Sequence, residues 1–318
     1  MDLSVILCTY NRAESLRKTL ETFSSLVVPP ALNWELLLVD NNSKDHTREV
    51  INEFAKASRF TVRYVFAKAQ GRSHALNAGV AAAQGDLLAF TDDDVLLHPD
   101  WLCNMLKAFR DFNCAAVAGR IIPVWHHQKP SWLEMEEQQV VVHFEFGDET
   151  RQLDRPPMGA NSGFRRNLFQ KYGTFRPDLG VSSDQRITCE DTEFGFRLLR
   201  GGEKIVYCAN AIIYHPVDPS RITKNYFLSW FYNDGRSLTR AEGLPAEGVF
   251  YLGIPRWLYR EIVVNFLNWI LCSNPKARFH HKLRTYRSLG KIVESWRLAH
   301  LRHRTHPTPP AASDVSPT

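Results

Sequence analysis

Residues 87–94 read LLAFTDDD, an apolar run that ends in three adjacent carboxylates. The apolar run predicts a buried strand, and Asp92, Asp93 and Asp94 then lie at the end of that strand. Unpaired carboxylates at a desolvated edge repel one another, whereas a divalent cation turns the same cluster into a site for a phosphorylated ligand. For this stretch alone, an acidic turn in solvent is the alternative interpretation.

Strand-like and helix-like segments alternate over the first 120 residues, which predicts a parallel sheet with helices on its faces. Ligands of such sheets collect at the carboxyl ends of the strands, where we expect residues 9–12, Asp40 and residues 92–94. The predicted strands cover residues 3–8, 35–40, 61–65 and 86–90; the first helix has Asn11 as its N-cap and a later one is opened by Pro99.

No glycine-rich phosphate-binding motif of the Gly-x-Gly-x-x-Gly or Walker type follows these strands, so a metal is the remaining route for holding phosphate. Asp40 can accept a hydrogen bond from the imide N–H of a uracil-like base, and Tyr10 can pack on such a ring. A capping or turn role is the alternative for Asp40.

The composition is that of a globular protein, with 44% hydrophobic and 23% charged residues among 318. This length suffices for one large domain, or one domain and an appendage. The six cysteines stand far apart without a Cys-x-x-Cys motif, which predicts reduced packing residues in a cytosolic protein. The start of the chain has no basic region before a short apolar stretch, so we expect a first strand there rather than a signal peptide.

The last third of the chain combines aromatic and basic residues. Its longest apolar run, Ile262–Cys272, is too short to span a bilayer. Between Lys276 and Arg304 there are nine Lys or Arg residues and one acidic residue, Glu294. This charge predicts peripheral attachment to the anionic inner face of the cytoplasmic membrane. Packing of this region on the core is the alternative. Nucleic acid is not an expected partner, because the aromatic residues do not alternate with the basic ones.

The chain carries the following motifs in order: Thr9-Tyr10-Asn11-Arg12, Val39-Asp40-Asn41-Asn42-Ser43, Gly71-Arg72 with Asn77, Gly85-Asp86 leading to Asp92-Asp93-Asp94, and Glu190-Asp191. Over roughly residues 3 to 215, this order resembles the family 2 glycosyltransferases. The resemblance implies an α/β, Rossmann-like GT-A core at 1–220. It also implies a nucleotide-diphosphate-sugar donor, Mg²⁺ or Mn²⁺ as cofactor, and inversion at the anomeric carbon. The aromatic and basic composition that follows the core predicts a helical extension at 221–304, and the proline-rich end predicts a disordered tail at 305–318.

The resemblance also implies roles for single residues. Asp94 is the expected metal ligand, with Asp92 and His215 as further ligands, although a histidine at a strand end is often structural. Asp191 is the expected general base, since an acceptor hydroxyl is a poor nucleophile until its proton is removed, and Glu190 would hold the acceptor or the base. The helix dipole is the alternative reason for acids at that helix start. The implied donor contacts are Thr9, Tyr10, Arg12, Asp40, Arg72, Asn77, Asp92, Asp93 and Asn161. For Asp93, sharing the metal and pointing into the core are the open alternatives.

The expected reaction is sugar transfer from the nucleotide-sugar, a UDP-sugar first among the candidates, to a hydroxyl of a saccharide or lipid-linked acceptor in surface polysaccharide or glycolipid synthesis. A nucleotidyltransferase is one rival, because it also uses a metal-binding acidic cluster but needs no base at Asp191. A catalytically silent nucleotide-sugar-binding or scaffold protein is the other rival.

Overall fold

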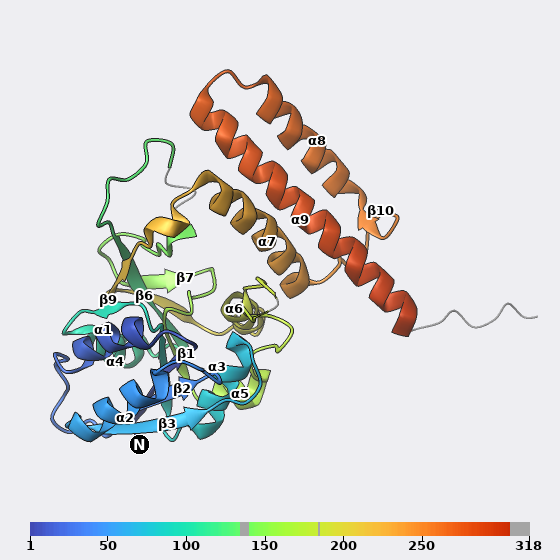
Figure 1. Ribbon diagram of the computed structural model, residues 1–318. Coiled ribbons are helices and arrows are strands. Elements are labelled where there is room, and N and C mark those ends of the chain that lie inside the picture. The colour runs from blue at the N-terminus through green and yellow to red at the C-terminus, as the bar shows by residue number, and fades with distance from the viewer. Residues whose placement is uncertain (134–139, 184, 306–318) are drawn as a thin grey trace, which may run out of the picture. The chain divides into compact units, whose positions relative to one another are not determined.

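The computed structural model describes residues 1–133, 140–183 and 185–305, and the chain divides into two compact units at Phe227/Leu228. The first unit is built around a nine-stranded sheet, and the second is helical (Figure 1). The predicted α/β core with a helical extension is therefore confirmed. The predicted tail falls mainly on residues 306–318, which lie outside the described residues.

The amino-terminal half of the sheet is parallel, as predicted. Its strands follow the order β3-β2-β1-β4, and every residue of β2 is buried because helices cover both faces of such a sheet. The direction of strand progression reverses between β1 and β4, and this switch point is where open α/β sheets bind ligands. The four strands are β1 (Leu3–Thr9), β2 (Trp34–Asp40), β3 (Thr61–Phe66) and β4 (Leu87–Thr91).

The second half of the sheet is mixed, because β8 pairs antiparallel with both β4 and β6. The apolar stretches 205–207 and 211–215 read as two short strands in the sequence, but one strand, β9, runs through both. A register shift between Gly119 and Arg120 of β6 accommodates Ala209, Asn210 and Ala211 of β9, which have no partner in that register. The strands of this half are β5 (Leu96–Leu97), β6 (Ala116–Val124), β7 (Arg151–Leu153), β8 (Asn161–Arg165) and β9 (Ile205–Pro216).

Two predicted helix starts need correction. Asn11 is not an N-cap: its φ is 50° and its side-chain carbonyl accepts from the Lys44 N–H at 2.7 Å, so the helix begins at Ala13. The helix after Pro99 begins at Trp101. The helices of this unit are α1 (Ala13–Phe23), α2 (Thr47–Ala57), α3 (Arg72–Ala82), α4 (Trp101–Phe112), α5 (Asn167–Tyr172), α6 (Glu190–Arg200) and the 3₁₀ turn η2 (Pro219–Arg221).

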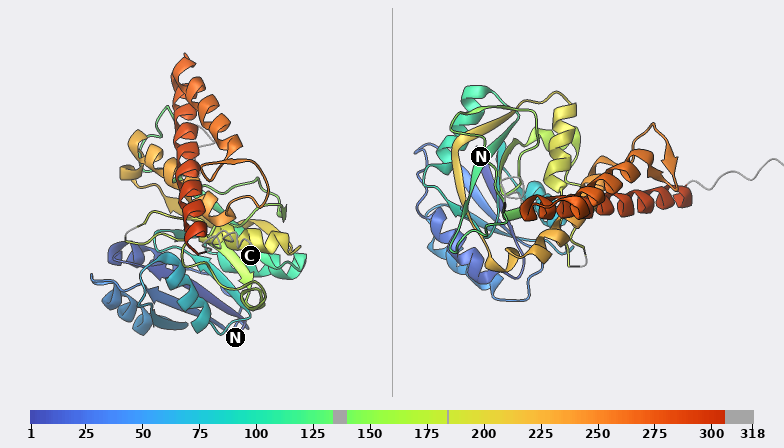
Figure 2. Two further views of the ribbon diagram at one scale, coloured as in Figure 1. Left: turned by 90° about the vertical axis from the view of Figure 1, so that its right-hand side faces the viewer. Right: turned by 90° about the horizontal axis from the view of Figure 1, so that it is seen from above.

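The second unit contains most of α7 (Lys224–Glu242), the hairpin β10 (Phe250–Tyr251) and β11 (Ile254–Pro255), α8 (Arg256–Leu271) and α9 (Pro275–Thr305). The helices α8 and α9 lie side by side (Figure 1 and Figure 2). Helices α7 and α9 cross at two glycines, where their backbones touch. A Cβ on Gly235 would collide with the carbonyl of Arg287, and one on Gly290 with the carbonyl of Tyr232.

Part of the basic C-terminal stretch is neutralised within this unit. Glu294 is fully buried and accepts hydrogen bonds from Arg240 at 2.7 Å and from Arg297. Burial raises the pKa of Glu294, but these hydrogen bonds and charges outweigh it and hold the pKa below its usual value. Among the described residues, no helix combines the length and apolarity needed to cross a membrane.

Candidate active site

The three carboxylates after β4 point in different directions. Asp93 turns into the protein, where its oxygens accept from the Thr9 hydroxyl at 2.7 Å and from Arg12 Nη1 at 2.9 Å. Burial raises the pKa of Asp93 to about 6; Arg12 opposes the rise and Asp94 adds to it. Both oxygens of Asp93 are thus engaged by protein donors, and the side chain stabilises the loop between β1 and α1.

Asp94 lies beside His215, with 3.4 Å between Asp94 Oδ1 and His215 Nε2. Burial raises the pKa of Asp94, but His215 and Arg12 outweigh it and hold the pKa well below the usual value. Burial lowers the pKa of His215, but Asp94 outweighs it and the net change is upward. His215 Nδ1 lies 3.2 Å from the Pro216 carbonyl, which can only accept, so Nδ1 carries a proton and Nε2 faces Asp94.

The Asp94–His215 pair fits a divalent metal whose coordination shell is completed by the substrate. Within the described parts of the chain, no three His, Cys, Asp or Glu side chains are arranged as a full ligand set. A carboxylate and an imidazole oriented through its other nitrogen are suitable ligands, and Mg²⁺ is often held by one or two carboxylates plus substrate phosphates. The remaining positions would therefore fall to donor phosphate oxygens and water.

Arg72, at the start of α3, joins Asp92 to Glu190. Its Nη2 lies 2.5 Å from Asp92 Oδ1, and its Nε lies 2.7 Å from Glu190 Oε1. Burial raises the pKa of Glu190 to about 7 and Asp191 adds to the rise, whereas Arg72 lowers it. One guanidinium thus connects the acidic loop after β4 with the beginning of α6. The resemblance implies that Arg72 contacts the donor, and in the structure its guanidinium pairs with two acids.

Asp191 is held by backbone donors on both carboxylate oxygens. The Gly159 N–H donates to Oδ2 at 2.6 Å, and the Thr192 N–H donates to Oδ1 at 2.6 Å. A Cβ at position 159 would lie 2.9 Å from Asp191 Oδ2, so the approach requires glycine. Cys189, just before α6, has a left-handed φ of 75°. Such strain is common where a site fixes its side chains.

Asp40, at the end of β2, is buried. Its carboxylate accepts from the Ser43 N–H at 2.8 Å and from the Tyr64 hydroxyl at 3.0 Å. Burial raises the pKa of Tyr64 to about 12, with Asp40 adding to the rise. Tyr10 is 37% exposed and can therefore pack on a ring from solvent. Sequence reasoning missed Tyr64, whose position in a strand gave no sign of a partner.

Two predicted donor contacts have partners inside the protein. Asn161 is fully buried and bonds Trp101 Nε1 at 2.8 Å and the carbonyls of Arg120 and Ala211. Asn77 exchanges two hydrogen bonds with the backbone of Phe175. These contacts explain an amide at each position without a ligand. Asn161 pairs in register with Thr91, directly before Asp92, but its side chain bonds the three groups named above.

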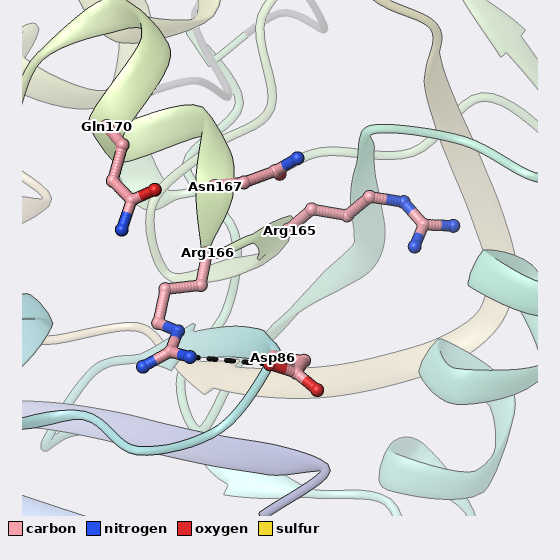
Figure 3. A pocket seen from close by; sticks show the side chains of 5 residues that line it. All are labelled: Asp86, Arg165, Arg166, Asn167 and Gln170. Atoms are coloured by element: carbon pink, nitrogen blue, oxygen red, sulfur yellow. Dashed lines mark hydrogen bonds and ion pairs between the residues drawn. The ribbon is translucent and has the colours of Figure 1, made fainter.

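A hollow of about 280 Å³ lies at the opposite edge of the sheet, where β4 begins. Figure 3 shows that Arg166 points to Asp86, at 3.4 Å, while Arg165 points away from them. Arg165 Nε donates to the Cys114 carbonyl at 2.9 Å. Asn167 and Gln170 complete the lining, and none of these five residues was predicted as a site residue. The acidic edge beyond β1 and β4 remains the candidate active site.

A parallel sheet with an acidic loop at its switch point, continued by mixed strands, defines the GT-A class of fold. Residues 4–173 match the model of the family described as Glycosyl transferase family 2. The match covers more than half of the chain, and the chain therefore belongs to glycosyltransferase family 2.

Similar proteins have diverse names. A glucosyl-dolichyl phosphate glucuronosyltransferase of Haloferax volcanii is 26% identical over 221 residues, which cover 68% of this chain and 69% of the relative. An O-antigen chain rhamnosyltransferase, WbaN of Salmonella anatum, is 28% identical and covers 74% and 78%. The mannosyltransferase PcManGT of Pyrobaculum calidifontis, solved with GDP-Man and Mn²⁺, superposes with a TM-score of 0.62 at 17% identity over 93% of this chain and 87% of that one. The last comparison supports the fold alone.

Proposed function

We propose that this protein transfers a sugar from a nucleotide-diphosphate-sugar donor to an acceptor hydroxyl, with inversion and with Mg²⁺ or Mn²⁺. The observation that carries the proposal is the guanidinium of Arg72, which contacts Asp92 in the loop after β4 and Glu190 at the start of α6. A transferase needs donor and acceptor groups within one active site, and this residue links the two segments.

On the donor side, Asp94 and His215 would hold the metal. When bound, a divalent ion supplies counter-charge to the diphosphate leaving group. Tyr10 and Asp40 would contact the nucleoside, and Thr9 and Arg12 support that edge through Asp93. The hydrogen bonds from Ser43 and Tyr64 orient the Asp40 carboxylate toward a fixed position. This arrangement favours a UDP-sugar as donor, because the imide N–H of uracil can donate to a carboxylate.

On the acceptor side, Asp191 would remove the hydroxyl proton as the bond to the anomeric carbon forms and the bond to the nucleotide breaks. A carboxylate placed opposite the leaving group suits a single displacement with inversion. The two backbone N–H groups on Asp191 fix its orientation, and the pairing of Glu190 with Arg72 positions the neighbouring turn.

The acceptor would be a saccharide or a lipid-linked saccharide in surface polysaccharide or glycolipid synthesis, at a cytoplasmic membrane surface. The names of the relatives, a dolichyl phosphate glucuronosyltransferase and an O-antigen chain rhamnosyltransferase, support this class of acceptor. The exposed side chains of the second unit, described below, support peripheral attachment.

A donor screen tests the proposal. The purified protein is incubated with UDP-, GDP- and dTDP-sugars and Mn²⁺, and release of the free nucleoside diphosphate is measured with and without EDTA. We expect metal-dependent release from one nucleotide class, with a UDP-sugar first. Release of pyrophosphate instead would support a nucleotidyltransferase, and nucleotide binding without turnover on any donor or acceptor would support a silent binding protein.

A further inference from the structure

We propose that the outer face of α8 docks on an anionic lipid bilayer, and that a basic pocket between α8 and α9 takes the phosphate of one lipid headgroup. The inference rests on the proposed peripheral attachment and names its surface and its ligand. All residues concerned belong to the second unit. Its evidence is independent of the active site.

The outer face of α8 is apolar over its second half. Between Val263 and Leu271, Asn268 is the one polar residue among the exposed positions, and Leu271 is 77% exposed. At about 100° per residue, Val263, Leu267 and Ile270 lie on one side of the helix. Monomeric proteins seldom leave such a continuous apolar strip in water. The exposed apolar residues of the strip are Val263, Val264, Phe266, Leu267, Ile270 and Leu271.

The inner face of α8 fixes which side points outward. Asn265 is buried and donates to the Ser288 hydroxyl of α9 at 3.1 Å. Glu261 accepts from the same hydroxyl at 2.7 Å and pairs with Lys291 at 3.0 Å. These contacts between α8 and α9 are polar and specific. Rotation of α8 that buried the apolar strip would break them.

The basic pocket adjoins the strip. It has a volume of about 410 Å³ and is lined by four basic side chains and one acid, Glu261. The basic side chains are Arg260, Arg284, Arg287 and Lys291, and Trp257, Val264 and Asn265 complete the lining. Arg287 pairs with Asp234 at 2.6 Å and Lys291 with Glu261. Within the part of the chain that the structure describes, Arg260 and Arg284 have no acidic side chain within 4.0 Å. Two guanidinium groups therefore remain available for an anion.

The pocket and the strip share residues, which identifies the ligand class. Trp257, 53% exposed, and Val264, 46% exposed, line the pocket and also lie beside the strip. A ligand that fits both must carry an anionic phosphate next to an apolar layer. An acidic phospholipid in a bilayer combines these two properties. Trp257 also lies under Lys291 Nζ, with 5.5 Å to the ring centroid, an arrangement suited to a membrane interface. A second copy of this chain is a poorer occupant, because the basic side chains of the two copies would meet at the contact and repel one another.

Vesicle co-sedimentation of the full-length protein tests the inference. The vesicles contain either phosphatidylcholine alone or phosphatidylcholine with phosphatidylglycerol. We expect binding to the anionic vesicles only, weakened by salt because charges near the surface are screened. A full-length protein that stays in the supernatant with anionic vesicles, or binds neutral vesicles equally well, overturns the inference.

Two variants separate the pocket from the strip. Arg260→Gln with Arg284→Gln should weaken binding to anionic vesicles about 10- to 30-fold, at roughly 1 kcal/mol per basic residue near the surface. Lys56→Gln with Arg59→Gln removes two exposed charges from the first unit and is the matched control, with little expected change. Val263→Ser with Leu267→Ser leaves the pocket charges intact and should also weaken binding. If the control variant lost as much vesicle binding, the effect would come from net charge alone, and the proposed headgroup pocket would be overturned.

Two further measurements distinguish a lipid headgroup from free phosphate in the pocket, and a bilayer from a second copy of the chain on the strip. In the first, inorganic phosphate is added as a competitor. If it blocks vesicle binding only at high concentration, the pocket is a headgroup site. If free phosphate saturates the pocket at low concentration, the headgroup site is contradicted. A dimer in analytical ultracentrifugation that Leu267→Ser dissociates would assign the strip to a second copy instead. Donor turnover should be unchanged in the arginine double variant, so a failure of lipid binding and a failure of the proposed transfer reaction are distinguishable.

Discussion

The guanidinium of Arg72 lies 2.7 Å from the carboxylate of Glu190, with Nε facing Oε1, and the same group reaches Asp92 through Nη2. These contacts join three segments that are far apart in the sequence. A planar guanidinium can serve two carboxylates at once, whereas a lysine ammonium is a single point charge on a flexible stem. The position of α6 relative to the acidic loop therefore depends on the shape of this side chain as well as its charge.

Arg72→Lys should lower kcat/KM about 10²-fold, because a displacement of about 1 Å between reacting groups costs that much. Steady-state kinetics with the donor found in the screen provide the measurement. Arg200→Lys, at an exposed position on α6, is the matched control. A wild-type kcat/KM in Arg72→Lys would mean that the bridge has no part in positioning.

Asp94→Asn and Asp191→Asn should fail in different ways. The first removes a metal ligand and should abolish metal-dependent donor binding, with a loss of about 10³-fold in kcat/KM. The second keeps the shape but loses the proton acceptor, so kcat should fall about 10²-fold or more while donor affinity stays within a few-fold. Donor titration and single-turnover kinetics distinguish them. Equal losses of donor binding would contradict this division of roles.

Metal binding should depend on the nucleotide. Since Asp94 and His215 supply two ligands, Mn²⁺ should bind weakly to the protein alone and at least tenfold more tightly with the nucleoside diphosphate present. Isothermal titration with and without nucleotide measures this difference, and His215→Ala should reduce it. Tight Mn²⁺ binding to the nucleotide-free protein would show a more complete ligand set than the pair described above.

Glu190 should make the stability of the protein fall as pH rises. Its pKa is about 7 in the folded protein against 4.5 as the ordinary value, so between these values the fold holds a proton that the unfolded chain has lost. Stability from this group is therefore lost as pH rises toward 7 and is level above it.

Glu190→Gln removes this titration, so its melting temperature relative to wild type should rise between about pH 5 and about pH 8. Thermal unfolding at both pH values is the measurement, with Glu21→Gln, exposed on α1, as the control. A relative melting temperature that falls over this range would mean that Arg72 dominates over burial.

The strands were predictable wherever burial dictated them. The run before Asp92 and residues 36–39 of the buried strand β2 are apolar because both faces are covered, and the hydrophobic pattern detects this. The continuity of β9 was not predictable, because it depends on the register of β6, a partner distant in sequence. Asn11 carried the pattern of an N-cap but bonds Lys44 from the next loop instead. Tertiary contacts decided both cases.

The candidate site was predictable as a set of motifs at one edge of the sheet and less so as a set of contacts. The position of Asp92, Asp93 and Asp94 after a strand follows from local sequence. The pairing of Arg72 with two acids and the Tyr64 bond to Asp40 do not, because no local pattern encodes which charges meet across the sheet. Asn161 is the opposite case, since the family resemblance implies a donor contact and no local pattern indicates its burial.

The crossing of α7 and α9 at Gly235 and Gly290 restricts how this part of the chain can evolve. Each glycine faces a backbone carbonyl of the other helix, so any side chain at either position would force the helices apart. Sliding one helix by a residue would bring a side chain into the same gap. The two positions are therefore expected to be inherited together, and a homologue that has lost one glycine should have abandoned this crossing for another packing of its C-terminal helices.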